Sequence, residues 1–446
     1  MPHSGDRRRP GAGTRAWRAA ASFLLLLALL AGSGRAQPSP GQPLGTFTDH
    51  LDERVPALMD AYEVPGAAVA LVRDGALVWA DTYGYANREQ KRAMSVDAVF
   101  RVESISKSVT AWGVMTLVEQ DRIDLDAPVG RYLDDGILSP SPYDERAVTV
   151  RRLLSHSAGL PLGPIGTDAE YAPAGDVPAL RDYLSREARL VRPPGSTFTY
   201  SNVGFNLLEL LVEEVTGRDF AAYMAEAVLR PLGMRRSSFA WADSLRPRMP
   251  RGYEPNGSPV PPYVYAASAA GGLMAPVEDV ARFVAAETID SATVEPRVLS
   301  PESIHRLHTP QIEIPGLYGV VADAYGLGHF VETLPSGRRA IWHGGQGHGW
   351  MTHVHAVPAT GDGIVLLTNS ERSWPLMARV LSDWAWWTGH GAVKMDRLRY
   401  GSMGLWGIVG LLGLASLWIL YRLGSGLRRG RRRWAPLSRA SRPWRL

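Results

Sequence analysis

The chain contains no cysteine in 446 residues. This absence excludes a disulfide framework, thiolate metal ligands and a cysteine nucleophile. Lysine is nearly as scarce, because only Lys91, Lys107 and Lys394 occur among 48 lysines and arginines together. A guanidinium cannot release its proton in a protein, whereas a buried lysine can be shifted into the range where its amine accepts one. A lysine in such a chain is therefore a clue to chemistry that arginine cannot perform.

One lysine lies three positions after a serine, in Ser104-Ile105-Ser106-Lys107. Residues 109–119 carry apolar side chains at helical spacing and follow an apparent strand over residues 99–102. Positions i and i+3 share one helix face, so Ser104 and Lys107 would meet near a helix N-terminus, where free N–H groups favour a developing anion. The pattern predicts a nucleophile, Ser104, with a proton acceptor, Lys107. By itself the motif leaves open a solvated pair on an amphipathic helix.

The two ends of the chain carry signals of export and membrane anchoring. Residues 1–36 run from a basic stretch through an apolar core to small residues, which predicts a signal peptide, and the proline-rich residues 37–44 indicate a linker. Residues 401–420 carry no charge and arginines follow, which predicts a transmembrane helix over residues 401–421 and a basic cytoplasmic tail over residues 422–446. Residues 45–395 would then form one extracytoplasmic domain, periplasmic or extracellular.

The net charge of +4 does not indicate a nucleic-acid partner, because the positive excess lies at the ends of the chain. Membrane topology explains this distribution better. With 45% hydrophobic and 21% charged residues, the remainder has an ordinary globular composition.

Strand signals occur at both ends of the predicted domain. Residues 66–72 and 77–82 are typical of a hairpin, and residues 339–343, 350–357 and 363–368 are typical of three further strands. A mostly helical region separates the two groups. The sequence therefore predicts an α+β fold, in which an antiparallel sheet is flanked by helices and interrupted by a helical insertion. Tryptophans at positions 374, 384, 386 and 387 predict a final helix packed on the sheet, with contact to the membrane interface as the alternative.

A second motif, Tyr200-Ser201-Asn202, precedes an amphipathic run over residues 205–215. A phenol and a carboxamide two residues apart, on a loop entering a helix, could both point into one cleft. Tyr200 could act as a base only if a nearby cation such as Lys107 stabilised its phenolate. The other interpretation is a tyrosine that anchors the loop while Ser201 or Asn202 caps the helix.

A third motif begins at His343 and is rich in glycine, which permits close approach of a ligand or another backbone. A strand N–H in this segment could join the N–H of Ser104 in an oxyanion hole. His343, His348, His353 and His355 also suggest a metal, but no carboxylate nearby in the sequence completes such a site. We therefore expect no metal and no cofactor, and ordinary strand packing for His353 and His355.

Five segments, in this order and spacing, resemble the serine β-lactamase-related family. The resemblance covers residues 45–390, and the family includes class C β-lactamases, D-alanyl-D-alanine carboxypeptidases, D-amino-acid peptidases and esterases. The segments are residues 100–107 (FRVESISK), 153–160 (LLSHSAGL), 200–202 (YSN), 231–234 (PLGM) and 343–345 (HGG).

The resemblance implies a role for each matching residue. It implies Ser104 as the acylated nucleophile, Lys107 and Tyr200 as its proton-transfer partners, and scaffold roles for His156 and residues 231–234. Which of Lys107 and Tyr200 is the base stays open. The implied substrate-binding and oxyanion residues are Asn202, as a donor to Lys107 and to the substrate amide; His343, Gly344 and Gly345, as the third motif; and Gln346, as the second oxyanion N–H.

One departure bears on the substrate. Class C β-lactamases usually carry Lys-Thr-Gly where this chain has His343-Gly344-Gly345, and a neutral histidine offers less positive charge to a β-lactam carboxylate. We therefore expect a serine hydrolase acting on a D-amino-acid peptide or a small ester. A true β-lactamase and a catalytically idle penicillin-binding or sensor module remain alternatives. Residues 161–194 and 252–272 are expected to line the pocket, and the oligomeric state stays open.

Overall fold

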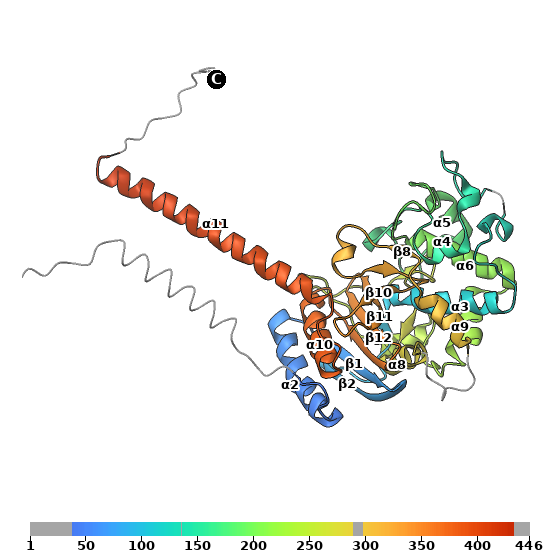
Figure 1. Ribbon diagram of the computed structural model, residues 1–446, viewed down its shortest axis with the longest axis horizontal. Coiled ribbons are helices and arrows are strands. Elements are labelled where there is room, and N and C mark those ends of the chain that lie inside the picture. Colours follow the sequence, from blue (N-terminus) through green and yellow to red (C-terminus); the bar gives the residue numbers. More distant parts are fainter. Residues whose placement is uncertain (1–37, 135, 289–297, 432–446) are drawn as a thin grey trace, which may run out of the picture.

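A nine-stranded antiparallel sheet forms the centre of the described chain (Figure 1). The computed structural model describes residues 38–134, 136–288 and 298–431, so the predicted signal peptide and the end of the tail lie outside the described residues. The strand order is β3-β2-β1-β13-β12-β11-β10-β9-β8. The strands are β1 (Gly66–Arg73), β2 (Ala76–Asn87), β3 (Arg92–Ala93), β8 (Ile312–Glu313), β9 (Ala324–Tyr325), β10 (Phe330–Thr333), β11 (Arg339–Gly347), β12 (Trp350–Val357) and β13 (Asp362–Thr368).

The predicted hairpin and the three predicted late strands are all present. Asp74 and Gly75 adopt positive φ values of 50° and 71°, which closes the tight turn between β1 and β2. Strand β1 pairs with β13, with Ala67 opposite Thr368, so distant parts of the chain complete one sheet. The predicted α+β architecture is therefore confirmed.

Helices cover both faces of the sheet (Figure 1). Helices α2 (Leu44–Tyr62) and α10 (Trp374–Trp387) share one apolar core with the sheet, in which Phe47 stacks on Trp387 with ring centroids 4.3 Å apart. This core confirms the prediction that the tryptophan-rich segment packs as a final helix. The other face carries α8 (Val277–Ala286) and the helical insertion.

The insertion lies between β3 and β8 in the sequence. Its α-helices, apart from α8, are α3 (Ser106–Glu119), α4 (Val150–Leu154), α5 (Leu180–Glu187), α6 (Asn202–Thr216), α7 (Phe220–Met224) and α9 (Pro301–His308). A π-helical turn covers Ala225–Leu229, and short 3-10 turns cover Glu103–Ile105, Val129–Arg131, Glu145–Ala147, Gly166–Asp168, Asp243–Arg248 and, between β8 and β9, Tyr318–Val320.

The predicted strand over residues 99–102 is shorter than expected and lies outside the main sheet. Only β4 (Phe100–Arg101) forms, and it pairs with β7 (Met274–Ala275). Glu103 then takes a positive φ of 52°, which ends the extended segment. A third small sheet joins β5 (Glu170–Tyr171) to β6 (Val264–Tyr265).

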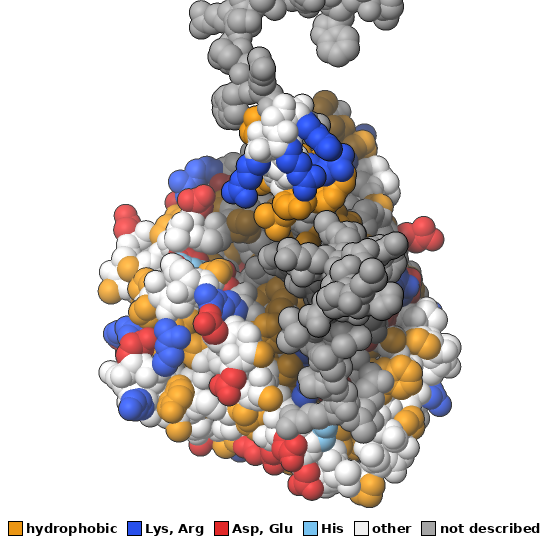
Figure 2. All heavy atoms as spheres, turned by 90° about the vertical axis from the view of Figure 1, so that its left-hand side faces the viewer, with side chains coloured by type: hydrophobic (Ala, Val, Ile, Leu, Met, Phe, Trp, Pro, Cys, Tyr) orange, Lys and Arg blue, Asp and Glu red, His pale blue; other side chains and the backbone are white. Residues whose placement is uncertain are grey.

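A long helix, α11 (Asp396–Arg428), projects away from the body of the protein (Figure 1). The segment Gly407–Arg428 of this helix has the length and the apolar composition needed to cross a membrane. Exposed arginines cluster at its far end, at positions 422, 428, 429 and 431, where Figure 2 shows basic side chains beside apolar ones. The helix contains the predicted span, while the orientation in a membrane stays a prediction.

Candidate active site

Ser104 lies in the 3-10 turn η1 (Glu103–Ile105), which leads directly into helix α3. The predicted i, i+3 register places Nζ of Lys107 3.0 Å from Oγ of Ser104. Lys107 is fully buried, whereas Ser104 borders a cleft. The serine is thus accessible while its lysine neighbour is screened from water.

The amine of Lys107 is held by three oxygen atoms. When Lys107 is protonated, Nζ donates to Oγ of Ser104, to Oδ1 of Asn202 at 2.9 Å and to the carbonyl of Ala270 at 2.7 Å, whereas the neutral amine keeps two N–H groups and turns its lone pair to the hydroxyl of Ser104. Burial lowers the pKa of Lys107 from 10.5 to about 7, although the charge of Glu103 acts in the opposite direction. A large fraction of this lysine is therefore neutral at physiological pH.

Tyr200 and Asn202 flank the start of helix α6. Ser201 caps this helix, since its Oγ accepts a 2.9 Å hydrogen bond from the N–H of Gly204. Oδ1 of Asn202 accepts from Nζ of Lys107, so this bond runs in the direction opposite to the predicted one. Asn202 thereby keeps its amide N–H groups for another partner.

The phenol of Tyr200 lies beside the same two residues. Nζ of Lys107 is 4.9 Å from the centre of the Tyr200 ring. Burial raises the pKa of Tyr200, and a hydrogen bond with Ser104 offsets only part of this effect. Tyr200 is therefore protonated at neutral pH.

The third motif runs along strand β11, which passes directly over the turn that carries Ser104. A Cβ on Gly345 would lie 2.3 Å from the carbonyl of Val102, and a Cβ on Gly347 would lie 2.3 Å from Cδ of Glu103. Any side chain at either position would push the strand away from Ser104. A Cβ on Gly344 would meet only ordinary contacts, of 3.7 Å or more. Gln346 lies between the two constrained glycines and borders the same cleft as Ser104.

His343 is fully buried and neutral. Its Nδ1 lies 2.9 Å from the carbonyl of Gly344, which can only accept, so Nε2 is left to accept from the hydroxyl of Tyr325 at 3.1 Å. Burial, followed by the charge of Lys107, holds the pKa of His343 well below its usual range. This residue therefore supplies no positive charge to the cleft.

His156 packs against Tyr200 and is hydrogen-bonded to the residue that follows it. Its Nδ1 accepts a 3.1 Å hydrogen bond from the N–H of Ser201, and its ring centroid lies 4.2 Å from that of Tyr200. Burial holds the pKa of His156 well below its usual range. These contacts agree with the scaffold role that the resemblance implies.

Glu103 is the residue that the sequence analysis overlooked. It is buried in a left-handed conformation, and its carboxylate accepts hydrogen bonds from Arg101 at 3.2 Å, Tyr263 at 2.9 Å and Tyr265 at 2.8 Å. These three partners fix the residue that immediately precedes Ser104. Its place beside the predicted nucleophile was the only signal in the sequence, because both tyrosines lie about 160 residues away, at separations of 160 and 162.

Ser104 opens onto a main cleft of about 770 Å³. Its wall includes Leu162, Ile165 and Gly166, from one loop that the sequence predicted to line the pocket. A smaller cavity of about 90 Å³ adjoins it and is lined by Tyr265 and Ala266, from the other predicted loop. The segment with Leu317 and Tyr318, which was not predicted to line the pocket, is exposed and forms an apolar side of the main cleft.

The four histidines considered for a metal do not converge among the described residues, where Glu287, His308 and His329 form the group with suitable spacing. His353 and His355 are buried within the sheet, as predicted. His348 contacts two carboxylates, Glu170 at 2.9 Å and Glu254 at 3.1 Å, and Nε2 of His355 lies 3.5 Å from Glu332. The two carboxylates beside His348 come from distant parts of the chain, Glu170 from β5 and Glu254 from a loop.

Residues 51–381 match the family model described as Beta-lactamase, and this match spans more than half of the chain. The chain belongs to the β-lactamase family. Penicillin-binding protein 4 of Amycolatopsis lactamdurans is 28% identical over 330 residues, which cover 72% of this chain and 84% of that protein. Esterase EstB of Burkholderia gladioli is 34% identical over 195 residues, which cover 42% of this chain and 50% of the esterase.

A third relative of this β-lactamase-family chain is the unguisins hydrolase ungD' of Aspergillus campestris. The two are 28% identical over 343 residues, covering 72% of this chain and 61% of the fungal protein. Among solved structures, the octameric penicillin-binding protein homologue of Pyrococcus abyssi has a TM-score of 0.62 at 26% identity, covering 76% of this chain and 77% of that one. A class C β-lactamase mutant has a TM-score of 0.63 at 19% identity, covering 77% and 99%, and this likeness shows the fold alone.

Residues 51–381 therefore form a serine hydrolase domain of the β-lactamase, penicillin-binding protein and esterase type, and the chain spans 61% of the length of the fungal relative.

Proposed function

We propose that this protein is a membrane-anchored, extracytoplasmic serine hydrolase that forms an acyl-enzyme at Ser104. The observation that carries the proposal is the buried amine of Lys107, 3.0 Å from Oγ of Ser104 and with a pKa lowered to about 7. An amine that is partly neutral at physiological pH can take the serine proton, which makes the hydroxyl a nucleophile.

The proposed reaction has two halves. Lys107 accepts the proton of Ser104 while Oγ attacks the substrate carbonyl, and the N–H groups of Ser104 and Gln346 stabilise the oxyanion. Tyr200, which is protonated and hydrogen-bonded to Ser104, donates a proton to the leaving group and regains one from Lys107. Water then attacks the acyl-enzyme and releases the acid. Asn202 orients Lys107 and offers its N–H groups to the substrate.

The wall of the main cleft favours an apolar, uncharged group next to the scissile bond. The rings of Tyr200, Tyr318 and Phe330 lie nearly parallel, with centroids 6.1 to 6.3 Å apart and interplanar angles of 10° to 19°. Among the described residues that border this cleft, none is a lysine or an arginine. A substrate carboxylate would therefore gain no ion pair with a lysine or an arginine, and the imidazole of His348 on this wall already contacts Glu170 and Glu254.

We accordingly propose that neutral esters are the preferred substrates, followed by peptides without a free carboxylate at the scissile end. The likeness to an esterase from Burkholderia gladioli supports this order. For a D-amino-acid peptide, the carboxylate of Glu371 on the cleft wall is the candidate partner of the free amine.

The test is covalent labelling and turnover with the full chain in detergent. A fluorophosphonate should label the protein at one site, identified by peptide mass spectrometry as Ser104. Ser104→Ala should lose both labelling and hydrolysis of a p-nitrophenyl ester, whereas Ser196→Ala, at an exposed serine, should keep both. Labelling elsewhere, or full ester turnover by Ser104→Ala, would contradict the proposal. Labelling without turnover of any ester, peptide or β-lactam would instead identify an idle binding module.

A further inference from the structure

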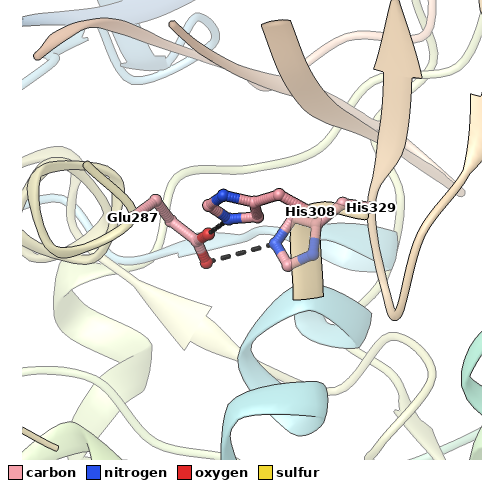
Figure 3. Close-up of side chains that lie close together, drawn as sticks. All are labelled: Glu287, His308 and His329. Carbon is pink, nitrogen blue, oxygen red and sulfur yellow. Dashed lines mark hydrogen bonds and ion pairs between the residues drawn. The ribbon is translucent and has the colours of Figure 1, made fainter. Parts of the chain in front are cut away.

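Three buried side chains converge beside helix α3 and outside the cleft (Figure 3). Glu287 follows the last residue of α8, His308 ends α9, and His329 immediately precedes β10. Their side chains are 3%, 5% and 2% exposed, and their candidate ligand atoms all lie within 4.8 Å of one another. No step of the proposed hydrolysis uses them.

The hydrogen bonds of His329 fix which of its nitrogens carries a proton. Nδ1 lies 3.0 Å from the carbonyl oxygen of Leu327, which can only accept, so Nδ1 donates. A neutral ring then presents the lone pair of Nε2 to Oε1 of Glu287 at 3.1 Å. Two acceptors at this distance repel each other unless a cation lies with them. That cation is a proton, on the ring or on the carboxylate, or a metal ion.

The environment of His329 matches what a metal ion requires, whereas Nδ1 of the buried His308 has no hydrogen-bond partner among the described residues. Metal-binding histidines commonly donate their other N–H to a backbone carbonyl, as His329 does. His308 also points Nε2 at Glu287, toward the second carboxylate oxygen (Figure 3). The 3.1 Å separation is close to the roughly 3.4 Å between neighbouring ligands of a tetrahedral ion with bonds of about 2.0 to 2.1 Å.

There is also room for a fourth ligand. A cavity of about 10 Å³, close to the space that one water molecule needs, borders Glu287 and His329 but not His308, so a water would approach the site from the side of those two residues. Two imidazoles, one carboxylate and one water form a ligand set that suits Zn²⁺.

We propose that Glu287, His308 and His329 form a buried zinc site that braces the helix bearing Ser104. The indole N–H of Trp112, on α3, donates to Oε1 of Glu287 at 2.6 Å, and Oγ of Ser108 donates to the carbonyl of Gly328 at 2.7 Å. The ion would therefore link α8, α9 and the turn before β10 to α3. It would act on stability and not in the chemical step.

A glycine makes this convergence possible. A Cβ on Gly326 would lie 2.3 Å from the carbonyl of Leu307, so only glycine lets the turn that carries His329 approach the end of α9 this closely. The N–H of Leu327 then bonds to the same Leu307 carbonyl at 2.9 Å, next to His308.

The test measures zinc itself. The full chain, without a polyhistidine tag and in detergent, is stripped with EDTA, re-equilibrated with zinc at about 10 µM and analysed by plasma mass spectrometry. We expect close to one zinc per chain and a melting temperature raised by roughly 3 to 5 °C relative to the stripped protein. Cobalt in place of zinc should give the visible absorption of a four-coordinate centre.

His308→Gln and His329→Gln should each lose the bound zinc and the zinc-dependent rise in melting temperature. His305→Gln, at an exposed position on the same helix, should retain both. Circular dichroism checks that the variants fold. If the variants do not fold, the zinc content of the wild-type protein alone decides whether the site binds zinc. Less than about 0.2 zinc per wild-type chain, or equal zinc in the wild type and a folded His308→Gln variant, would overturn the proposal and leave a proton as the shared cation.

Discussion

Nζ of Lys107 lies 3.0 Å from Oγ of Ser104 at a position where the lysine has no exposed surface. The same environment acts in opposite ways on the two candidate bases. Burial lowers the pKa of Lys107 to about 7 and raises the pKa of Tyr200 above its usual range. The amine is thus partly free to accept a proton at neutral pH, whereas the phenol keeps its own. This difference favours Lys107 as the base, a choice that the sequence alone left open.

The first prediction concerns pH. Because the base must be unprotonated, kcat/KM for a neutral ester should rise with pH, with an inflection near pH 7, the value to which burial lowers the pKa of Lys107. Below the inflection the rate should fall about tenfold per pH unit. Tyr200→Phe should be slower but should keep the acidic limb. If the acidic limb of the pH profile disappeared in Tyr200→Phe, the tyrosine would be the base.

The second prediction concerns Lys107 itself. Lys107→Arg should be nearly as damaging as Ser104→Ala, because arginine preserves the charge but accepts no proton. We expect a loss of about 10² to 10⁴ in kcat/KM for an ester. Lys91→Arg, at an exposed turn, is the matched control and should retain full activity. A folded Lys107→Arg enzyme within about fivefold of the wild type, which is only ~1 kcal/mol, would refute the role of the amine.

The third prediction concerns the anchor beside Ser104. The Arg101 and Glu103 side chains are 5% and 3% exposed and lie 3.2 Å apart. Glu103→Gln keeps the size of the side chain but leaves Arg101 as an uncompensated buried charge, so the free energy of unfolding should fall by about 3 to 5 kcal/mol. Denaturant unfolding measures this change. Asp144→Asn breaks an exposed ion pair with Arg146 and should leave the unfolding midpoint near the wild-type value.

The fourth prediction concerns the substrate. Nitrocefin should be hydrolysed poorly relative to p-nitrophenyl esters, because His343 is neutral and fully buried where the lactamases carry a lysine. Parallel measurements of kcat/KM for the two substrates decide this point. A value for nitrocefin of ~10⁶ M⁻¹s⁻¹ or above would place the protein among efficient β-lactamases and contradict the proposed preference.

Local patterns in the sequence predicted those features that depend on residues close together in the chain. The hairpin was predictable from two apolar runs separated by a turn with Asp74 and Gly75, and the contact of Ser104 with Lys107 followed from helical spacing. The late strands were predictable from their composition and turns. Their place in one sheet with the early hairpin was predicted from strand signals at both ends of the domain, on either side of a helical region.

Features built from distant residues could not be predicted in this way. Glu103 is held by Tyr263 and Tyr265, and His329 meets Glu287 only because the end of α8 packs against the turn before β10. Nothing in the spacing of these residues marks them as neighbours. The strand over residues 99–102 was predicted too long because its composition does not reveal the left-handed turn at Glu103.

The last prediction concerns membrane topology. Helix α11 contains an apolar part, Gly407–Arg428, long enough to cross a bilayer, and exposed arginines lie at its far end. Positively charged residues stay on the cytoplasmic side, so the hydrolase domain should face outward. A protease added outside spheroplasts should digest this domain and spare an epitope placed after Leu446. Lysed spheroplasts control for access, since there the protease should remove the epitope as well. Loss of the epitope in intact spheroplasts, with the hydrolase domain protected, would reverse the orientation and place Ser104 in the cytoplasm.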